Sequence, residues 1–261
     1  HYQTSPNDLT QLLDNPQILL YALFSDQDCL GCILTAEEGG LSHELIQDVQ
    51  LGKRRPRGHL APTLLANHLG LDKAAAQKSL RVMRIAVHPD IQGRGLGRRM
   101  IGLLVEANRH FDYIATSFGA TSELVDFWTS NDFVPLHLGH QRDQSSGCHS
   151  LLMCRALHEQ SRHWVEEGNL YFNSSLRYLL STTYRSLELA IVRSLISSQP
   201  RPNVVADINP LLGYYVDGGN SFDSIGFMLE NLIYSLDKVQ LDRTSDLLLW
   251  KVVQKRTWTE C

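Results

Sequence analysis

The sequence predicts an α/β domain up to residue 157, followed by an all-helical appendage. Three observations support this. Apolar runs of strand length alternate with helical patterns up to Leu157, a glycine-rich turn joins a strand to a helix near residue 95, and only amphipathic helical patterns follow residue 158. A chain of 261 residues, 43% of them hydrophobic, can bury one large core or two modest ones. We therefore expect two domains, residues 1–157 and 158–261.

The α/β part opens with a helix, because Ser5 and Asp8 are cap-type residues around a proline. Two apolar runs at 17–25 and 29–37 flank a polar turn and predict a β-hairpin. Further helices are expected at 42–51, 60–70, 95–109 and 121–130, and further strands at 80–88, 111–117, 132–139 and 150–157.

The appendage shows three amphipathic patterns, which predict helices at 171–198, 220–236 and 242–256. A segment rich in proline and asparagine breaks the pattern at 200–210. No repeat of 20 to 50 residues and no low-complexity segment is apparent.

Composition narrows the class of protein. The apolar runs are too short to cross a bilayer and no signal peptide opens the chain, so we expect a cytoplasmic protein without a membrane partner. The net charge of −4 gives no global nucleic-acid signature, so any RNA contact must come from local patches. Because the chain begins at His1 rather than methionine, we expect it to be part of a longer polypeptide.

The cysteines do not indicate a disulfide framework or a metal site. Five cysteines are an odd number, scattered over a long chain. Cys29 and Cys32 match C-x-x-C, but they lie in an apolar strand pattern that predicts buried thiols, and no second C-x-x-C completes a zinc site. We expect no metal.

The informative motif is RIAVHPDIQGRGLGRR at residues 84–99, a strand that passes through a glycine-rich turn into a helix. Glycines let backbone N–H groups approach a diphosphate, and the helix N-terminus adds partial positive charge. Arg94, Arg98 and Arg99 add full charges. Residues 85–87 end the strand, where backbone can pair with a pantetheine arm and the Val87 N–H can face a thioester oxygen.

Other glycine motifs fit poorly. A P-loop requires G-x-x-x-x-G-K-[ST], which is absent from the sequence, and the spacing is wrong for a Rossmann fingerprint. A plain strand–turn–helix connection is the remaining alternative, and the additional arginines argue against it. The pattern therefore favours coenzyme A.

Residues 84–97 resemble motif A of the GNAT superfamily. The wider run resembles the acetyltransferase half of bacterial tRNA(Met) cytidine acetyltransferases, well over residues 1 to 157 and loosely over the tail. Four blocks carry this resemblance: RRPRGHL at 54–60, RIAVHP at 84–89, SFGATSEL at 117–124 with Phe127 and Trp128, and RDQSSG at 142–147.

The resemblance implies a GNAT fold, in which helices flank a mixed, mostly antiparallel sheet. It also implies transfer of acetyl from acetyl-CoA to N4 of the wobble cytidine of elongator tRNA(Met). The implied cofactor contacts are Ile85, Ala86, Val87, Gln92, Gly93, Arg94, Gly95, Leu96, Gly97, Arg98 and Glu123. Enzymes of this family carry an upstream ATP-driven, helicase-like module, and ATP is expected only there because this sequence has no Walker motif.

Two residues are candidates for catalysis. His88 follows Val87, and its neutral imidazole could take the proton that the cytidine amine must lose. Packing beside Pro89 is the alternative for His88. Glu123 is the rival base, but it could equally cap its own helix, so we expect a cofactor contact instead.

The sequence departs from the usual GNAT pattern at two places. Many GNAT enzymes have a tyrosine that protonates the departing thiolate near the end of the later helix, where this chain has Phe127 and Trp128. Spacing with Leu124 predicts that both rings belong to the core. Asn131 and Asp132 replace the glycine usual before the final Phe, which a turn tolerates because asparagine enters the left-handed region readily.

The densest basic cluster is Lys53, Arg54, Arg55 and Arg57, which suits RNA phosphates. A solvated charged loop is the alternative. The resemblance alone adds Arg142 as an RNA contact. Two other functions remain open: a GNAT enzyme acting on a protein or small-molecule amine, and a non-catalytic acetyl-CoA-binding module.

Overall fold

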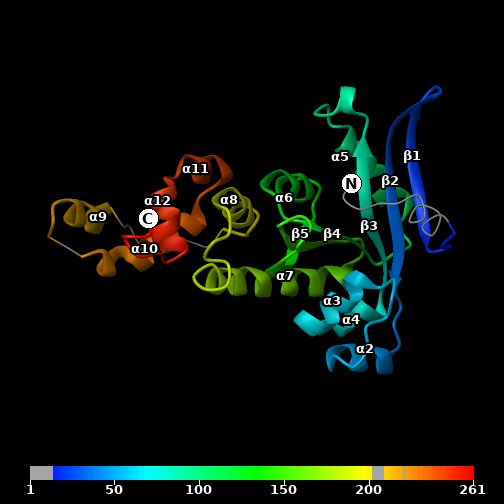
Figure 1. Cartoon of the computed structure of the whole chain (residues 1–261), viewed down its shortest axis with the longest axis horizontal. Coiled ribbons are helices and arrows are strands. Elements are labelled where there is room, and N and C mark those ends of the chain that lie inside the picture. The colour runs from blue at the N-terminus through cyan, green and yellow to red at the C-terminus, as the bar shows by residue number, and fades with distance from the viewer. Residues whose placement is uncertain (1–13, 202–208, 220) are drawn as a thin grey trace. The chain divides into compact units, whose positions relative to one another are not determined.

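The computed structural model describes residues 14–201, 209–219 and 221–261 (Figure 1). The chain divides into two compact units: residues 1–120 with 127–172, and residues 121–126 with 173–261. The helix predicted from Ser5 lies outside the described residues. The domain boundary at residue 157 stays a prediction. Within the described ranges, no helix combines the length and apolar character that crossing a bilayer requires.

A six-stranded mixed sheet forms the first unit (Figure 1). Its strands are β1 (Ile18–Ser25), β2 (Asp28–Gly39), β3 (Lys78–Val87), β4 (Tyr113–Gly119), β5 (Val134–Arg142) and β6 (His149–Ala156). Their order across the sheet is β1-β2-β3-β4-β6-β5, and every pair is antiparallel except β3 with β4. The predicted α/β class and its mostly antiparallel sheet are confirmed.

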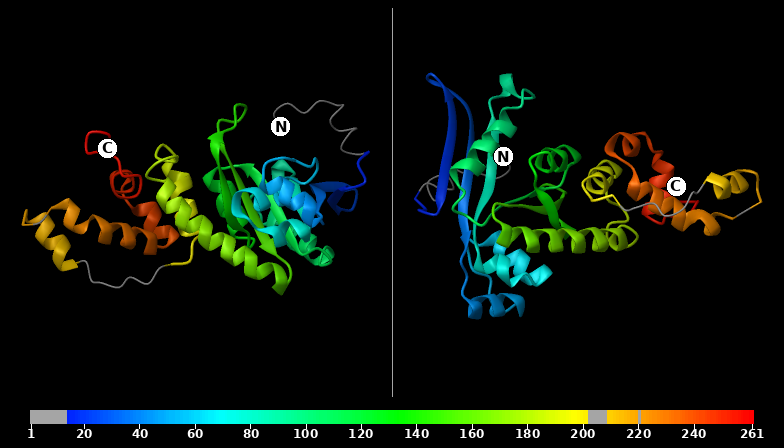
Figure 2. Two further views of the ribbon diagram at one scale, coloured as in Figure 1. Left: turned by 90° about the horizontal axis from the view of Figure 1, so that it is seen from below. Right: turned by 180° about the vertical axis from the view of Figure 1, so that it is seen from behind.

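Helices pack on the sheet and close its core. They are α2 (His43–Gln50), α3 (Leu60–Leu69), α4 (Asp72–Ala76), α5 (Leu96–Ala107), the end of α6 (Ser122–Thr129) and the start of α7 (Glu159–Leu179). Figures 1 and 2 show α2, α3 and α4 grouped together. Trp164 of α7 is the largest fully buried side chain. Its indole meets the Tyr113 ring edge-on at 4.9 Å and donates to the Gln77 side chain at 2.8 Å.

The two parallel strands separate halfway along the sheet. β3 pairs with β4 only from Ser79–Tyr113 to Val82–Thr116, although β3 continues to Val87 and β4 to Gly119. Beyond this point β3 pairs only with β2, and β4 only with β6. The last residues of β3 therefore have one edge that faces no strand of the described chain.

The second unit is helical, with a buried core that includes Leu195, Ile225, Leu241 and Val252. It contains α8 (Leu189–Ser197), α9 (Asn209–Val216), α10 (Phe222–Ser235), α11 (Lys238–Arg243), α12 (Asp246–Leu248) and a π-helical turn at Leu249–Val253, together with the end of α7 and the start of α6. The predicted helix at 220–236 is confirmed by α10.

Two predicted helices of the tail are wrong in extent. The pattern at 171–198 is broken between α7 and α8, where the Ser181 and Thr182 hydroxyls donate to carbonyls of the preceding helical turn. Hydroxyl side chains that bond to nearby backbone compete with the helix. The pattern at 242–256 is broken at Thr244, whose backbone is extended, and at Ser245, which precedes α12 with a non-helical backbone.

The thiols of the C-x-x-C pair are not the buried packing groups that strand alternation predicts. Cys29 is exposed and Cys32 is half-buried. Both lie near the turn of the β1–β2 hairpin, where a register shift at Leu23 and Phe24 disturbs the pairing. A bulge changes which face successive residues occupy. In the part of the chain that the structure describes, no three histidine, cysteine or acidic side chains are grouped to hold a metal ion.

Candidate acetyl-CoA and RNA sites

The exposed end of β3 offers backbone hydrogen-bonding groups on its open edge. The His88 N–H donates to the Leu30 carbonyl of β2 at 2.8 Å. Because successive residues of a strand point their N–H groups to opposite edges, the Val87 N–H is directed away from β2. Ala86 is exposed, and Ile85 and Val87 are half-buried. An extended ligand could add here as a further strand.

The glycine turn follows the strand after one short 3₁₀ turn, Pro89–Ile91. Gly93 and Gly95 have φ angles of +73° and +80°, in the left-handed region that favours glycine. A Cβ atom at either position would meet no heavy atom of the described ranges within 4 Å. The turn therefore has open space beside it. Gln92 steadies its start, because its side-chain amide donates to the Val87 carbonyl at 3.0 Å.

Helix α5 begins directly after Gly95, and no side chain of the described residues caps its N-terminus. The N–H groups of its first turn therefore lack a side-chain acceptor, and an anion could supply one. Arg94, Arg98 and Arg99 are all exposed around this turn. Gly97 is different in kind, because a Cβ there would lie 3.1 Å from the Phe127 ring. This glycine permits close packing of α5.

His88 lies between the strand and the glycine turn, with 53% of its side chain exposed. Its Nδ1 accepts from the Asp90 N–H at 3.4 Å and thereby caps the 3₁₀ turn. A neutral imidazole that accepts through Nδ1 carries its proton on Nε2. His88 can therefore act as a base through Nδ1 only by exchanging this long hydrogen bond for one to the substrate.

Glu123 stands in the first turn of α6. Its pKa is lowered by a hydrogen bond from its own backbone N–H, then by the Thr121 and Ser122 side chains and the charge of Lys238. Thr121 Oγ1 also accepts from the Leu124 N–H at 3.4 Å. These contacts are those of a helix cap, and a lowered pKa makes the carboxylate a weaker base. Glu123 belongs to the second unit, so its cofactor contact stays a prediction.

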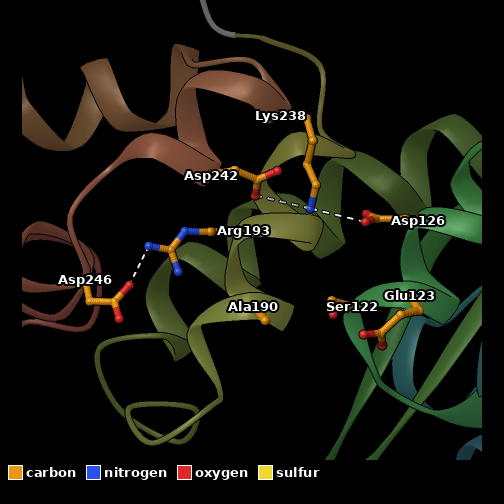
Figure 3. Close-up of a pocket in the computed structure, with 8 residues that line it drawn as sticks. All are labelled: Ser122, Glu123, Asp126, Ala190, Arg193, Lys238, Asp242 and Asp246. Atoms are coloured by element: carbon orange, nitrogen blue, oxygen red, sulfur yellow. Dashed lines mark hydrogen bonds and ion pairs between the residues drawn. The ribbon is translucent and has the colours of Figure 1, made fainter.

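The second unit contains an acidic pocket of about 490 Å³ (Figure 3). Its lining residues are Ser122, Glu123, Asp126, Ala190, Arg193, Lys238, Asp242 and Asp246. Both cations are paired: Lys238 lies 3.2 Å from Asp126 and 3.6 Å from Asp242, and Arg193 lies 2.5 Å from Asp246. Four carboxylates against two cations disfavour a phosphate-bearing ligand.

The predicted RNA-binding loop is exposed at Lys53, Arg54, Arg55 and Arg57. The Lys53 and Arg54 N–H groups donate to the Asp48 carbonyl, which ties the loop to the end of α2. A pocket beneath the loop is lined by Arg55 and by His68 of α3. The loop's contact with RNA stays a prediction.

The RDQSSG block forms a tight turn between β5 and β6. Asp143 accepts hydrogen bonds from the Ser145 N–H, the Ser146 N–H and the Ser146 hydroxyl, and these bonds lower its pKa. Arg142 Nη1 donates to the Gly147 carbonyl at 2.9 Å. This turn geometry explains the residue types of the block, and the RNA contact of Arg142 stays a prediction.

The aromatic pair at the end of α6 belongs to the core in part. Trp128 is 3% exposed and meets the Phe133 ring at 4.8 Å and the Phe127 ring at 5.1 Å. The core prediction for Trp128 is confirmed. In the turn that follows, Asp132 rather than Asn131 adopts the left-handed conformation, with φ of +63°. Asp tolerates this region as Asn does.

The structure thus brings together the end of β3, His88, the glycine turn and the start of α5, all in the first unit. Two features escaped the sequence patterns. Glu38 and Arg81 form a buried ion pair, and His68, His137 and His140 form a cluster. No local pattern predicts either feature, because Glu38 is far from Arg81 along the chain and His68 is far from His137 and His140.

The comparisons with known proteins match the part of the chain that contains these residues. The family model described as GNAT acetyltransferase 2 matches residues 1–109 and 105–158. The tRNA(Met) cytidine acetyltransferase TmcA of Vibrio cholerae is 40% identical over 264 aligned residues, which cover all of this chain and 36% of the relative. The protein of the same name from Nitrosococcus halophilus is 33% identical and again covers all of the chain and 36% of the relative.

The chain therefore spans about a third of the length of these curated relatives. Among solved structures, an N-acyl amino acid synthase from uncultured soil microbes matches with a TM-score of 0.42 and 13% identity. That match covers 61% of this chain and 78% of the other.

Proposed function

Because the chain belongs to the GNAT acetyltransferase 2 family, we propose that it is the acetyl-CoA-dependent acetyltransferase part of a longer RNA-modifying enzyme. The proposed reaction is transfer of acetyl to N4 of the wobble cytidine of elongator tRNA(Met), in the cytoplasm. Residues 1–157 form the proposed catalytic domain and residues 158–261 a helical tail domain. The similarity to tRNA(Met) cytidine acetyltransferases over the whole chain supports this assignment.

One structural observation carries the cofactor assignment. β3 separates from β4 after Val82, and its open edge is followed by the 3₁₀ turn, the glycine turn and the N-terminus of α5, which has no side-chain cap among the described residues. The edge suits an extended amide-bearing arm, and the glycine turn suits a diphosphate. Ile85 to Val87 would hold the arm, and Gln92 to Arg98 would hold the diphosphate.

Acetyl-CoA supplies an acetyl group activated as a thioester. The residues of this chain would orient it, since the Val87 N–H on the open edge can donate to the thioester oxygen. The acceptor amine of cytidine is conjugated and barely basic, so its attack depends on positioning and on removal of a proton. We propose that His88 Nδ1 accepts that proton from the amine, directly or through a water molecule.

His88→Ala is expected to lower turnover by about 10²-fold or more while acetyl-CoA affinity stays within a few fold, because a base acts in the transition state. His88→Asn is the matched control. Its side-chain oxygen can accept the Asp90 N–H as His88 does, but it cannot take a proton. Turnover measured at saturating substrate, in a longer chain that shows activity, tests this. Normal turnover in His88→Asn would leave His88 only its capping role.

The substrate assignment is tested by the yield of acetylcytidine from tRNA. The upstream module of the relatives would use ATP to help the target base leave its stack, which costs a few kcal/mol. We therefore expect the 261-residue chain to bind acetyl-CoA yet acetylate tRNA poorly. A longer chain given ATP should restore the yield.

Mass spectrometry of tRNA after incubation with acetyl-CoA, with and without ATP, measures this. Full, ATP-independent activity of the 261-residue chain would show that the account of the upstream module is wrong. Acetylation of a protein or small amine by the longer chain, with none on tRNA, would favour the first alternative function. Binding of acetyl-CoA without transfer to any of these acceptors would favour a non-catalytic module.

A further inference from the structure

The pocket beneath the basic loop belongs to the first unit and has a volume of about 340 Å³. Its wall comes from α2, the loop and α3, and includes Val49, Arg55, His59, Thr63, Asn67 and His68. Two hydrogen bonds hold the wall in place. Asn67 Nδ2 donates to the Val49 carbonyl at 2.9 Å, and His59 Nδ1 accepts from the Gly39 N–H at 3.0 Å. The buried Thr63 hydroxyl has no hydrogen-bond partner among the described residues.

Three imidazoles continue from this pocket onto the sheet, and we call His68, His137 and His140 the histidine strip. The His68 ring stacks on the His137 ring with centroids 4.4 Å apart and planes 12° apart. His140 meets His137 edge-on at 5.8 Å. His68 and His140 are exposed and His137 is half-buried. The strip therefore presents planar rings to solvent next to the cationic loop.

The environment of both stacked rings lowers their pKa and so favours the neutral form of each. Burial, helped by the charges of His68 and His140, lowers the pKa of His137 to about 4. The pKa of His68 is lowered by partial burial of its ring, then by the charge of His140 and then by the charge of Arg55. Neutral rings stack on one another and on other aromatic faces without charge repulsion. Arg55 lines the same pocket as His68, so it lies next to the strip.

The strip lies at the level of the sheet where β3 and β4 part. His137 pairs with Leu152 of β6, and Leu152 pairs with Ser117 of β4. Ser117 comes directly after Thr116, the last residue of β4 that pairs with β3. Neighbouring strands lie about 4.8 Å apart, so His137 is about 10 Å from the open end of β4. The strip therefore lies two strands away from β4, at the level where β4 loses its pairing with β3.

We propose that the histidine strip and Arg55 bind single-stranded RNA, with bases stacked on the exposed imidazoles and a phosphate held by the guanidinium. Base stacking on aromatic rings combined with a cationic contact is the usual means of holding single-stranded nucleic acid. The proposal rests on the proposed RNA acetyltransferase function and adds residues that hold unpaired nucleotides of the RNA substrate.

The test is binding of a short, fluorescently labelled, cytidine-rich single-stranded RNA to the 261-residue chain at low salt, without acetyl-CoA. His68→Ala is expected to weaken affinity by about tenfold, because it removes one stacking face. His68→Phe keeps a ring and should retain most of the affinity. Arg55→Ala should weaken affinity and also reduce the slope of log affinity against log salt by about one. His68→Ala should leave that slope unchanged.

His43→Ala is the matched control, because His43 is an exposed histidine of the first unit on α2, hydrogen-bonded to Gln47 rather than in the strip. Thermal unfolding of each variant shows that the fold is retained. Equal RNA affinity of His68→Ala and His43→Ala, or no RNA binding by the parent chain at low salt, would overturn the proposal. Neither result depends on acetyl transfer, so the strip can fail while the acetyltransferase assignment stands, and the reverse.

Discussion

Gly95→Glu is expected to abolish acetyl-CoA binding. Gly95 adopts φ of +80° at the start of α5, and a side chain there would project into open space beside the turn. In the proposed site that space is taken by the diphosphate, which a second negative charge would repel. The left-handed conformation costs a residue with a Cβ only about 1–2 kcal/mol, so the fold should survive. Isothermal titration calorimetry with acetyl-CoA measures the loss.

Two further substitutions separate the effect of side-chain bulk from the effect of negative charge on acetyl-CoA binding. Gly95→Gln adds the same bulk without charge, so the difference between it and Gly95→Glu reports the electrostatic part. Gly102→Glu places the same new side chain on the exposed surface of α5, where a Cβ also meets nothing within 4 Å, and should leave affinity unchanged. Unchanged affinity in a folded Gly95→Glu variant would show that Gln92 to Arg98 is not the cofactor turn.

Arg81→Met is expected to lower the free energy of unfolding by about 3–5 kcal/mol, because it leaves the buried Glu38 carboxylate without its cation. The Glu38 side chain is fully buried, and its Oε1 accepts from Arg81 Nε at 2.6 Å. Its Oε2 accepts from the Ala61 N–H in the first turn of α3, which has no side-chain cap from His59. The pair thus joins β2, β3 and α3.

The double variant Glu38→Gln/Arg81→Met removes both charges and still offers the Ala61 N–H an acceptor, so it should recover most of the lost stability. Glu159→Gln is the control for an exposed pair, since Glu159 and Arg162 are 82% and 61% exposed at 3.2 Å. Its cost should stay below about 1 kcal/mol. Urea unfolding, monitored by tryptophan fluorescence, gives the free energy of unfolding of Arg81→Met, of the double variant and of Glu159→Gln. A cost for Arg81→Met as small as that for Glu159→Gln would contradict the prediction.

The order of elements in the first unit could be predicted because each carries a local pattern. Two apolar runs on either side of a polar turn predicted both strands of the β1–β2 hairpin, and β3 and α5 were predicted within two residues at their ends. The helices of the second unit were harder. Thr244 and Ser245 interrupt an amphipathic pattern by adopting non-helical backbone, and apolar periodicity carries no information about that choice.

In the candidate site, too, some features could be predicted from contiguous residues and others could not. Residues 84–99 form one continuous strand, turn and helix, so the motif could predict a diphosphate cradle from local chemistry alone. The sequence left open whether Glu123 caps its own helix, and it did not show that His88 Nδ1 caps a turn or that Asp132 takes the left-handed conformation. Each depends on hydrogen bonds or backbone angles that several residue types could satisfy.

The sequence by itself determined the α/β class, the family and the position of the glycine turn, because these depend on periodicity and on contiguous residues. Only the tertiary structure decided where β3 leaves β4, which buried charge Arg81 neutralises, and that His68 stacks on His137. These features join positions separated by more than 30 residues, with no local pattern connecting them. Their energies arise from burial and contact after the chain has folded, when water is excluded and the distances between side chains are set.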